Sequence, residues 1–201
     1  MSLTKKSIVL HVMGMPFDGD TVKTKSLGGS ESAAYYQARE LAARGHRVTV
    51  FTAGNSAGVF DGVTYLGCGE VSQGSMLGRD FEHYARNTPH DVLIIQRHPA
   101  AFQQQFASKV NIWQTHDLAL VRTAGVVNQM MWNVDRVTCV SEWHRQQVLK
   151  TYELGEDYVS VVPNGVDYNL YCYHPNERME EIEARLGEDF FPVGGSGVVP
   201  R

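Results

Sequence analysis

The sequence has little of what marks several large classes of protein. Its three cysteines, Cys68, Cys139 and Cys172, are odd in number, widely spaced and without a Cys-x-x-Cys pair. This usage predicts buried, reduced thiols in a cytoplasmic protein, not a disulfide framework or a metal site. No apolar run reaches the roughly 18 residues that a membrane span needs. The first six residues lead directly into a strand pattern, so we expect neither a transmembrane segment nor a signal peptide.

The sequence also has no large excess of positive or negative charge. The 201 residues hold 18 Lys and Arg against 22 Asp and Glu, a formal net charge of -4, with no basic run that would indicate a nucleic-acid partner. The dinucleotide fingerprint, the phosphate loop, the nucleophile elbow of serine hydrolases and the paired-histidine metal motif are all missing. With 43% hydrophobic residues, the chain has the composition and length for one sizeable α/β domain.

Short apolar runs alternate along the chain with segments of helical character. The expected strands are 7–13, 47–52, 63–66, 91–96, 110–115, 136–140 and 158–162. One expected helix follows the Gly28–Gly29 pair, with Ser26 or Ser30 as its N-cap and Gly45 just past its end, and the others cover 76–86, 100–107, 118–132 and 142–152. This alternation predicts an α/β fold with a doubly wound, mostly parallel, Rossmann-like sheet.

The last 30 residues differ in character from the rest. Residues 176–186 are highly charged, and residues 190–201 begin a glycine-rich, strand-like pattern. We therefore expect a domain over residues 1–172 and a linker or tail over residues 173–201, the tail being the truncated start of a second domain.

The stretch Gly28-Gly29-Ser30-Glu31 opens the first long helix. Two glycines let a ligand approach the backbone, and the first turn of a helix presents unpaired N–H groups at the positive end of its dipole. This pattern favours binding of a phosphate or carboxylate. A simple turn would explain the glycines as well.

The other unusual polar residues follow the predicted strands. They are Arg97 and His98, then His116 and Asp117, then Ser141 and Glu142, and finally Asn164. Because ligands bind at the carboxyl ends of parallel strands, we expect these residues to converge on one edge. Asp117 and Ser141 could equally be helix N-caps, and Asn164-Gly165 could be an ordinary turn. We expect His144 and Arg145 to lie in solvent.

Taken in order, these motifs resemble the N-terminal domain of a GT-B glycosyltransferase of the retaining family 4. The pieces are 27–31, 42–50, 91–94 with His98, His116-Asp117, 140–142 and 161–167. The resemblance implies that the chain is the acceptor-side half of a GT-B architecture. Gly28 and Gly29 would then lie against a phosphate of the nucleotide-sugar donor or of the acceptor, and His116 would face the transferred sugar.

The resemblance also has implications for the second, donor-binding domain of such an enzyme. The donor-binding basic residues and paired glutamates of the second domain are absent, so the chain alone should be inactive. The acceptor could be a sugar, a lipid or a small molecule, the polar excursion 14–25 is a candidate acceptor element, and no metal or other cofactor is expected. Two other functions remain open: a stand-alone Rossmann-like module that binds a phosphorylated metabolite, and half of a GT-B nucleotide-sugar epimerase.

Overall fold

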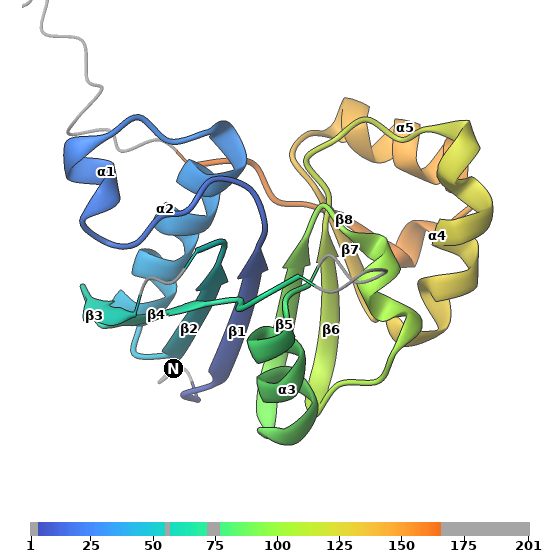
Figure 1. Cartoon of the computed structure of the whole chain (residues 1–201). Coiled ribbons are helices and arrows are strands. Elements are labelled where there is room, and N and C mark those ends of the chain that lie inside the picture. The colour runs from blue at the N-terminus through green and yellow to red at the C-terminus, as the bar shows by residue number, and fades with distance from the viewer. Residues whose placement is uncertain (1–3, 55–56, 72–76, 166–201) are drawn as a thin grey trace, which may run out of the picture. The chain divides into compact units, whose positions relative to one another are not determined.

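A computed structural model describes residues 4–54, 57–71 and 77–165. Eight strands form one sheet, in the order β3-β4-β2-β1-β5-β6-β7-β8 (Figure 1). Their bounds are β1 Ser7–Val12, β2 Arg47–Thr52, β3 Gly58–Phe60, β4 Val63–Gly67, β5 His90–Gln96, β6 Ser108–Gln114, β7 Arg136–Cys139 and β8 Val159–Val161. All neighbouring strands are parallel except β3 and β4, which are antiparallel. The predicted fold class is confirmed.

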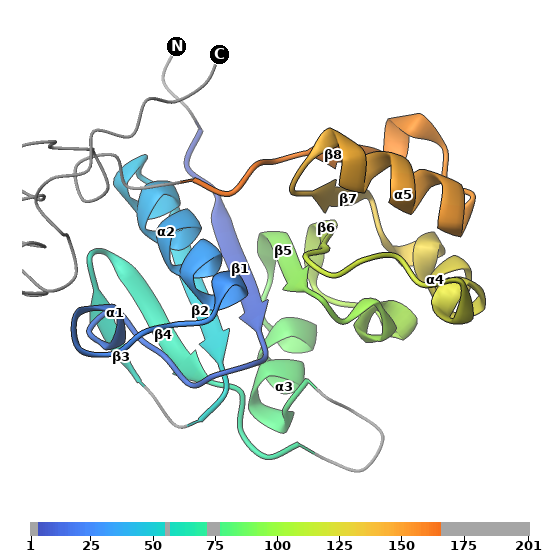
Figure 2. The same cartoon turned by 90° about the horizontal axis from the view of Figure 1, so that it is seen from above.

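Helices cover both faces of the sheet (Figures 1 and 2). They are α1 Thr21–Thr24, α2 Gly29–Ala43, α3 Arg79–Asn87, α4 Ala124–Met130 and α5 Glu142–Tyr152. Ala34, Tyr35 and Ala38 of α2 pack into a core on one face. Helices α3, α4 and α5 pack into a second core on the other face. The central strands lie between the two cores, which explains why these strands are apolar on both sides.

Helix α2 ends where the sequence predicts but begins differently. Gly45 has φ +88°, its N–H donates to the Ala42 carbonyl, and the His46 N–H donates to the Leu41 carbonyl, which together form a Schellman motif. The N-cap, in contrast, is Gly28, which has no side chain to cap the helix. The prediction of Ser26 or Ser30 as N-cap was wrong, and Ser30 instead donates its hydroxyl to the Glu31 carboxylate.

Two predicted helices are broken up in the structure. The expected helix 118–132 is an irregular segment followed by a 3-10 turn, the short α4, and a second 3-10 turn. The backbone N–H of Ala119 donates to the Gln147 side chain, and that of Leu120 donates to the Tyr152 hydroxyl, so side chains of α5 replace helical hydrogen bonds. The expected helix 100–107 is a 3-10 turn over Pro99–Gln103.

Strand β3 and helix α1 were not predicted. Strand β3 pairs with β4 through a two-residue turn in which Asp61 has φ +49° and Gly62 has φ +77°, both in the left-handed region. Asp-Gly is a strong hairpin signal, which could have revealed the strand. Helix α1 is a single turn inside the polar excursion 14–25.

Strand β1 marks the switch point of the sheet. Strands β2, β4 and β3 lie in this spatial order on one side of β1, and strands β5 to β8 add successively on the other. A crevice is expected outside the carboxyl ends of β1 and β5, which is where ligands bind in such sheets. The residues that follow Val12 and Gln96 are therefore expected to contact a ligand.

Cys68 and Cys139 are buried free thiols, and burial raises the pKa of Cys68 to about 12 and that of Cys139 to about 11. Cys172, the predicted boundary at residue 172 and the predicted tail lie outside the described residues. Over the ranges that the structure describes, no helix is both long and apolar enough to cross a bilayer.

Candidate functional site

The predicted polar residues follow the carboxyl ends of the strands, as expected from the topology. Arg97 and His98 follow β5, and His116 and Asp117 follow β6. The strands β1, β5 and β6 pair in parallel, so their carboxyl ends lie side by side, and Glu31 ties the start of α2 to Met15, just past β1. The loop that contains Gly28 and Gly29, here called the glycine loop, therefore shares one edge of the sheet with Arg97 and His116, next to the switch point.

Glu31 anchors the glycine loop from within. Its side chain is buried, and its carboxylate accepts hydrogen bonds from the Met15 N–H at 3.1 Å and the Ser30 hydroxyl at 3.0 Å. Burial acts to raise the pKa of Glu31, but the backbone N–H groups of Glu31 and Met15, the Ser30 hydroxyl and the Arg97 charge outweigh it and hold that pKa below 4.5. The ionised carboxylate thus ties the loop after β1 to the start of α2.

The two glycines differ in what surrounds them. A Cβ on Gly28 would overlap the Glu31 carboxylate, and so would a Cβ on Gly14 across the loop. A Cβ on Gly29 would meet nothing within 4 Å. Gly28 is therefore required for packing against Glu31, whereas the side of the loop at Gly29 is open to a ligand.

We expect Gly28→Ala to destabilise the domain by about 2 to 3 kcal/mol, because the added methyl group displaces a buried carboxylate. Gly28 has φ -65° and ψ 163°, which alanine adopts freely, so the cost comes from the overlap. In a Glu31→Ala background the same substitution should cost less than about 1 kcal/mol, because the overlap is gone. Urea denaturation of the four proteins in this cycle measures the coupling.

Gly29→Ala is the matched control and should leave stability within about 0.5 kcal/mol of wild type. Equal costs of Gly28→Ala in both backgrounds would contradict the packing role of Glu31.

The Glu31 carboxylate also predicts a pH dependence of stability. Because its pKa is lowered on folding, its stabilisation is present above pH 4.5 and lost as the pH falls through the folded-state value. Glu31→Gln should weaken that acid sensitivity.

Arg97 has an unusual backbone and a paired side chain. Its φ is +66°, in the left-handed region that residues other than glycine rarely adopt, and its N–H donates to the Gln114 carbonyl at 3.0 Å. Its guanidinium donates two hydrogen bonds to the Asp117 carboxylate, from Nε at 2.8 Å and from Nη2 at 3.0 Å. The pair joins the loop after β5 to the loop after β6.

His116 lies on a turn that is held on both sides. The Asp117 carbonyl accepts hydrogen bonds from the Thr115 hydroxyl at 3.1 Å and from His144 Nε2 at 2.9 Å. Burial lowers the pKa of His116 below 6.5; Arg97 and His144 lower it further, and Asp117 and Glu31 oppose the shift. The imidazole is therefore neutral at pH 7, and its buried Nε2 has no hydrogen-bond partner within the described chain.

His98 is also half-buried beside this turn. Burial and the adjacent Arg97 lower the pKa of His98, and Asp117 opposes the shift. At neutral pH both imidazoles can therefore donate from one ring nitrogen and accept at the other, which is the chemistry needed to bind a hydroxyl group. Asp117 does not cap a helix, because no helix begins at Leu118.

Ser141, Glu142 and Asn164 are placed differently. The Ser141 hydroxyl accepts from the His144 N–H at 3.2 Å and so caps α5, while the Glu142 carboxylate accepts from Arg145 and Gln146 on the same helix. Asn164 lines a pocket of about 360 Å³ together with Gln114 and residues of α2. Thus Ser141 and Glu142 have clear structural roles, whereas Asn164 lies in this pocket against α2.

The expectation that His144 and Arg145 lie in solvent was wrong. His144 is 3% exposed, and the Arg145 guanidinium donates from Nε to the Val159 carbonyl at 2.9 Å. The signal for His144 was its spacing: His144, Val148 and Tyr152 recur every four residues and share the buried side of α5. The role of His144 in holding the 115–117 turn could not be read from the sequence.

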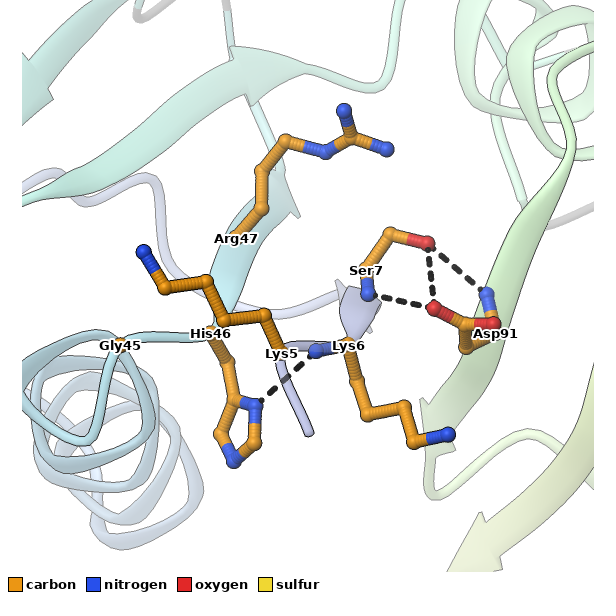
Figure 3. Close-up of a pocket in the computed structure, with 7 residues that line it drawn as sticks. All are labelled: Lys5, Lys6, Ser7, Gly45, His46, Arg47 and Asp91. Carbon is orange, nitrogen blue, oxygen red and sulfur yellow. Dashed lines mark hydrogen bonds between the residues drawn. The ribbon is translucent and has the colours of Figure 1, made fainter. Parts of the chain in front are cut away.

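A second pocket, of about 400 Å³, lies at the amino end of the strands, and it is lined by Lys5, Lys6, Ser7, Gly45, His46, Arg47 and Asp91 (Figure 3). The side chains of Lys5, Lys6 and Arg47 point away from one another (Figure 3). Asp91 is bound to Ser7 and Lys109, and these contacts lower its pKa. This pocket therefore lacks converging polar groups. In the part of the chain that the structure covers, no group of three His, Cys, Asp or Glu side chains could hold a metal ion.

Comparisons with known proteins agree with this architecture. The model of glycosyltransferase family 4 matches residues 27–170. Solved structures with the same fold include a glycosyltransferase from Rickettsia africae, at 16% identity and a TM-score of 0.61, covering 92% of this chain and 50% of its own. Anabaena HepE, solved in complex with UDP-glucose, is 15% identical, with a TM-score of 0.60 and coverages of 90% and 50%. The catalytic domain of Arabidopsis thaliana starch synthase IV, bound to ADP and acarbose, is 9% identical, with a TM-score of 0.60 and coverages of 97% and 61%.

No curated protein sequence matches the chain. The chain spans about half the length of the first solved structures that it matches. At these identities the structural likeness shows the fold alone.

Proposed function

This chain belongs to glycosyltransferase family 4, and from that premise we propose that it is the acceptor-binding half of a retaining enzyme that transfers a sugar from a nucleotide-sugar to an acceptor. The observation that carries the proposal is the meeting of the Glu31-anchored glycine loop, Arg97 and the neutral His116 at one edge of the sheet. That edge lies outside the switch point, where a second domain and a shared ligand would approach.

The donor is proposed to be a nucleoside diphosphate sugar. Anabaena HepE is described with UDP-glucose and starch synthase IV with ADP and acarbose, and both share this fold. The open side of the loop at Gly29 offers backbone N–H groups at the start of α2 to a phosphate, with Ser30 and the anchored Glu31 completing the turn. We propose that the nucleotide-sugar is a substrate and that no metal or other cofactor takes part.

His116 is proposed to bind a hydroxyl of the transferred sugar through its unpartnered Nε2, while Asp117 and His144 hold the turn. Arg97, His98 and Asn164 would contact acceptor or sugar groups, and Ser141 and Glu142 would support them through α5. This half supplies no nucleophile. Its contribution is to position the reactants and to stabilise the charge of the departing phosphate.

The test is to assay the full-length protein that contains this chain against a panel of nucleotide-sugars and acceptors. We expect a glycosylated product whose anomeric configuration, measured by NMR, matches that of the donor, and no product from residues 1–201 alone. Product from the 201-residue chain would overturn its role as half an enzyme. Inversion at the anomeric carbon would refute the retaining mechanism, and an epimerised nucleotide-sugar without transfer would indicate an epimerase.

A further inference from the structure

The pair formed by Arg97 and Asp117 has the geometry of a bound anion. The guanidinium presents Nε and Nη2 to the two carboxylate oxygens, Oδ2 at 2.8 Å and Oδ1 at 3.0 Å. This fork binds two oxygens of a phosphate as well as two oxygens of a carboxylate. Asp117 therefore occupies a position that a phosphate-bearing ligand could take.

We propose that Arg97 is an anion receptor which Asp117 occupies in the ligand-free chain, and that a phosphate-bearing ligand binds at this edge by displacing the Asp117 carboxylate. The shared chemistry is that of a phosphate group, whether it belongs to a nucleoside diphosphate or to a phosphorylated sugar.

The exchange is feasible because the pair is accessible. The side chain of Arg97 is 38% exposed and that of Asp117 is 56% exposed. An ion pair this open to water contributes little to stability, so an incoming anion has little to overcome. The Asp117 backbone stays in place during the exchange, because its carbonyl is held by Thr115 and His144. Only the carboxylate has to rotate away.

The backbone conformation of Arg97 is a second feature typical of a ligand site. A non-glycine residue at φ +66° is strained and persists only where the surroundings enforce it. Here the N–H bond to the Gln114 carbonyl and the buried Gln96 before it hold the residue at the end of β5. Such conformations cluster at ligand sites, and this one lies at the switch point of the sheet.

The neighbours of Arg97 suit the exchange. His98 and His116 are both neutral at pH 7, and the charge of Arg97 contributes to that. A phosphate placed on Arg97 would favour protonation of both imidazoles and turn them into additional donors. The released Asp117 carboxylate would remain beside His116 and could accept a hydrogen bond from a ligand hydroxyl.

The test is to titrate the 201-residue chain with inorganic phosphate and pyrophosphate at low ionic strength, with the backbone N–H signals of residues 97 and 116 followed by NMR, which every variant retains. We expect Asp117→Asn to bind about two- to fivefold more tightly than wild type, because it removes the competing carboxylate of an exposed pair. Arg97→Gln should weaken binding at least about tenfold, and Arg97→Lys, which keeps the charge without the fork, should lie between.

Glu40→Gln is the matched control. Glu40 pairs with Arg44 at 3.0 Å on α2, so this variant changes the net charge equally and also releases an arginine, but at another site. Its affinity should equal that of wild type. Equal or weaker binding by Asp117→Asn, or an equal gain in Glu40→Gln, would overturn the proposal.

Two further arms identify the source of the phosphate. If Asp117→Asn raises the affinity for UDP and ADP only, the receptor binds the phosphates of a nucleotide. If it raises the affinity for glucose 1-phosphate and glucose 6-phosphate, the receptor binds a phosphorylated sugar. The ligand assignment rests on the proposed function, but the exchange does not, because phosphate binding is measured without sugar transfer. A second readout is the pKa of His116, whose titratable and charged neighbours are Asp117, Arg97, His144 and Glu31. Phosphate should raise that pKa in wild type and not in Arg97→Gln.

Discussion

In the full-length protein, His116→Ala is expected to lower kcat/KM for sugar transfer about a hundredfold, the usual cost of removing one polar group that contacts the reacting ligand. The imidazole is half-buried, neutral and held on a turn that Thr115, Arg97 and His144 fix. Its Nε2 has no partner among the described residues, so a ligand can bind it without first breaking a bond.

The control for this variant is His83→Ala. His83 is an exposed histidine on α3, away from the His116 turn, so its loss should leave kcat/KM unchanged. Because burial holds the pKa of His116 below 6.5, the wild-type rate should be constant from about pH 7 to pH 8 and fall in acid as the imidazole gains a proton. A loss of activity in His83→Ala as large as that in His116→Ala, or wild-type activity without His116, would remove this histidine from the site.

Gly78→Ala is expected to destabilise the chain by about 4 kcal/mol or more, enough to unfold much of it at 37 °C. Gly78 has φ +83°, and a Cβ there would overlap the Cys68 carbonyl oxygen, which belongs to the backbone and cannot move aside. The same carbonyl accepts hydrogen bonds from the N–H groups of Asp80 and Phe81, so it fixes the start of α3 against the end of β4.

Gly125→Ala provides the opposite case within the same protein. Gly125 lies inside α4, and a Cβ there meets nothing within 4 Å. Alanine should stabilise the chain by about 0.5 to 1 kcal/mol, because it restricts the unfolded chain and favours the helix. Guanidinium denaturation of both variants measures the difference. Similar stabilities for Gly78→Ala and wild type would show that the strained turn before α3 relaxes at little cost.

The strands of this sheet were the most predictable part of the fold. Buried parallel strands are mostly apolar runs, and β1, β2 and β5 show this pattern, with His11 and Thr49 as polar residues inside the first two. Segment 118–132 was predicted incorrectly because its apolar residues suit a helix by spacing. Long-range hydrogen bonds from its backbone N–H groups to Gln147 and Tyr152 decide its conformation, and such contacts leave no local signal.

The candidate site was predictable in position and not in detail. Chain topology places Arg97 and His116 at one edge, because both follow strands that pair in parallel. The sequence does not reveal that Glu31 turns inward to bind Met15, or that Asp117 pairs with Arg97. Both contacts depend on where loops meet in space, and the second required a left-handed arginine that no pattern predicts.

The register of the central strands has a consequence for biosynthesis. Ile8 of β1 pairs with Val92 of β5, and His90 of β5 pairs with Ser108 of β6. During translation, β1 therefore waits for the 84 residues from Ile8 to Val92 before it acquires its second neighbour. Pairings of such sequence separation are slow to form, and an emerging chain with one side of β1 open exposes an unpaired strand edge that favours aggregation.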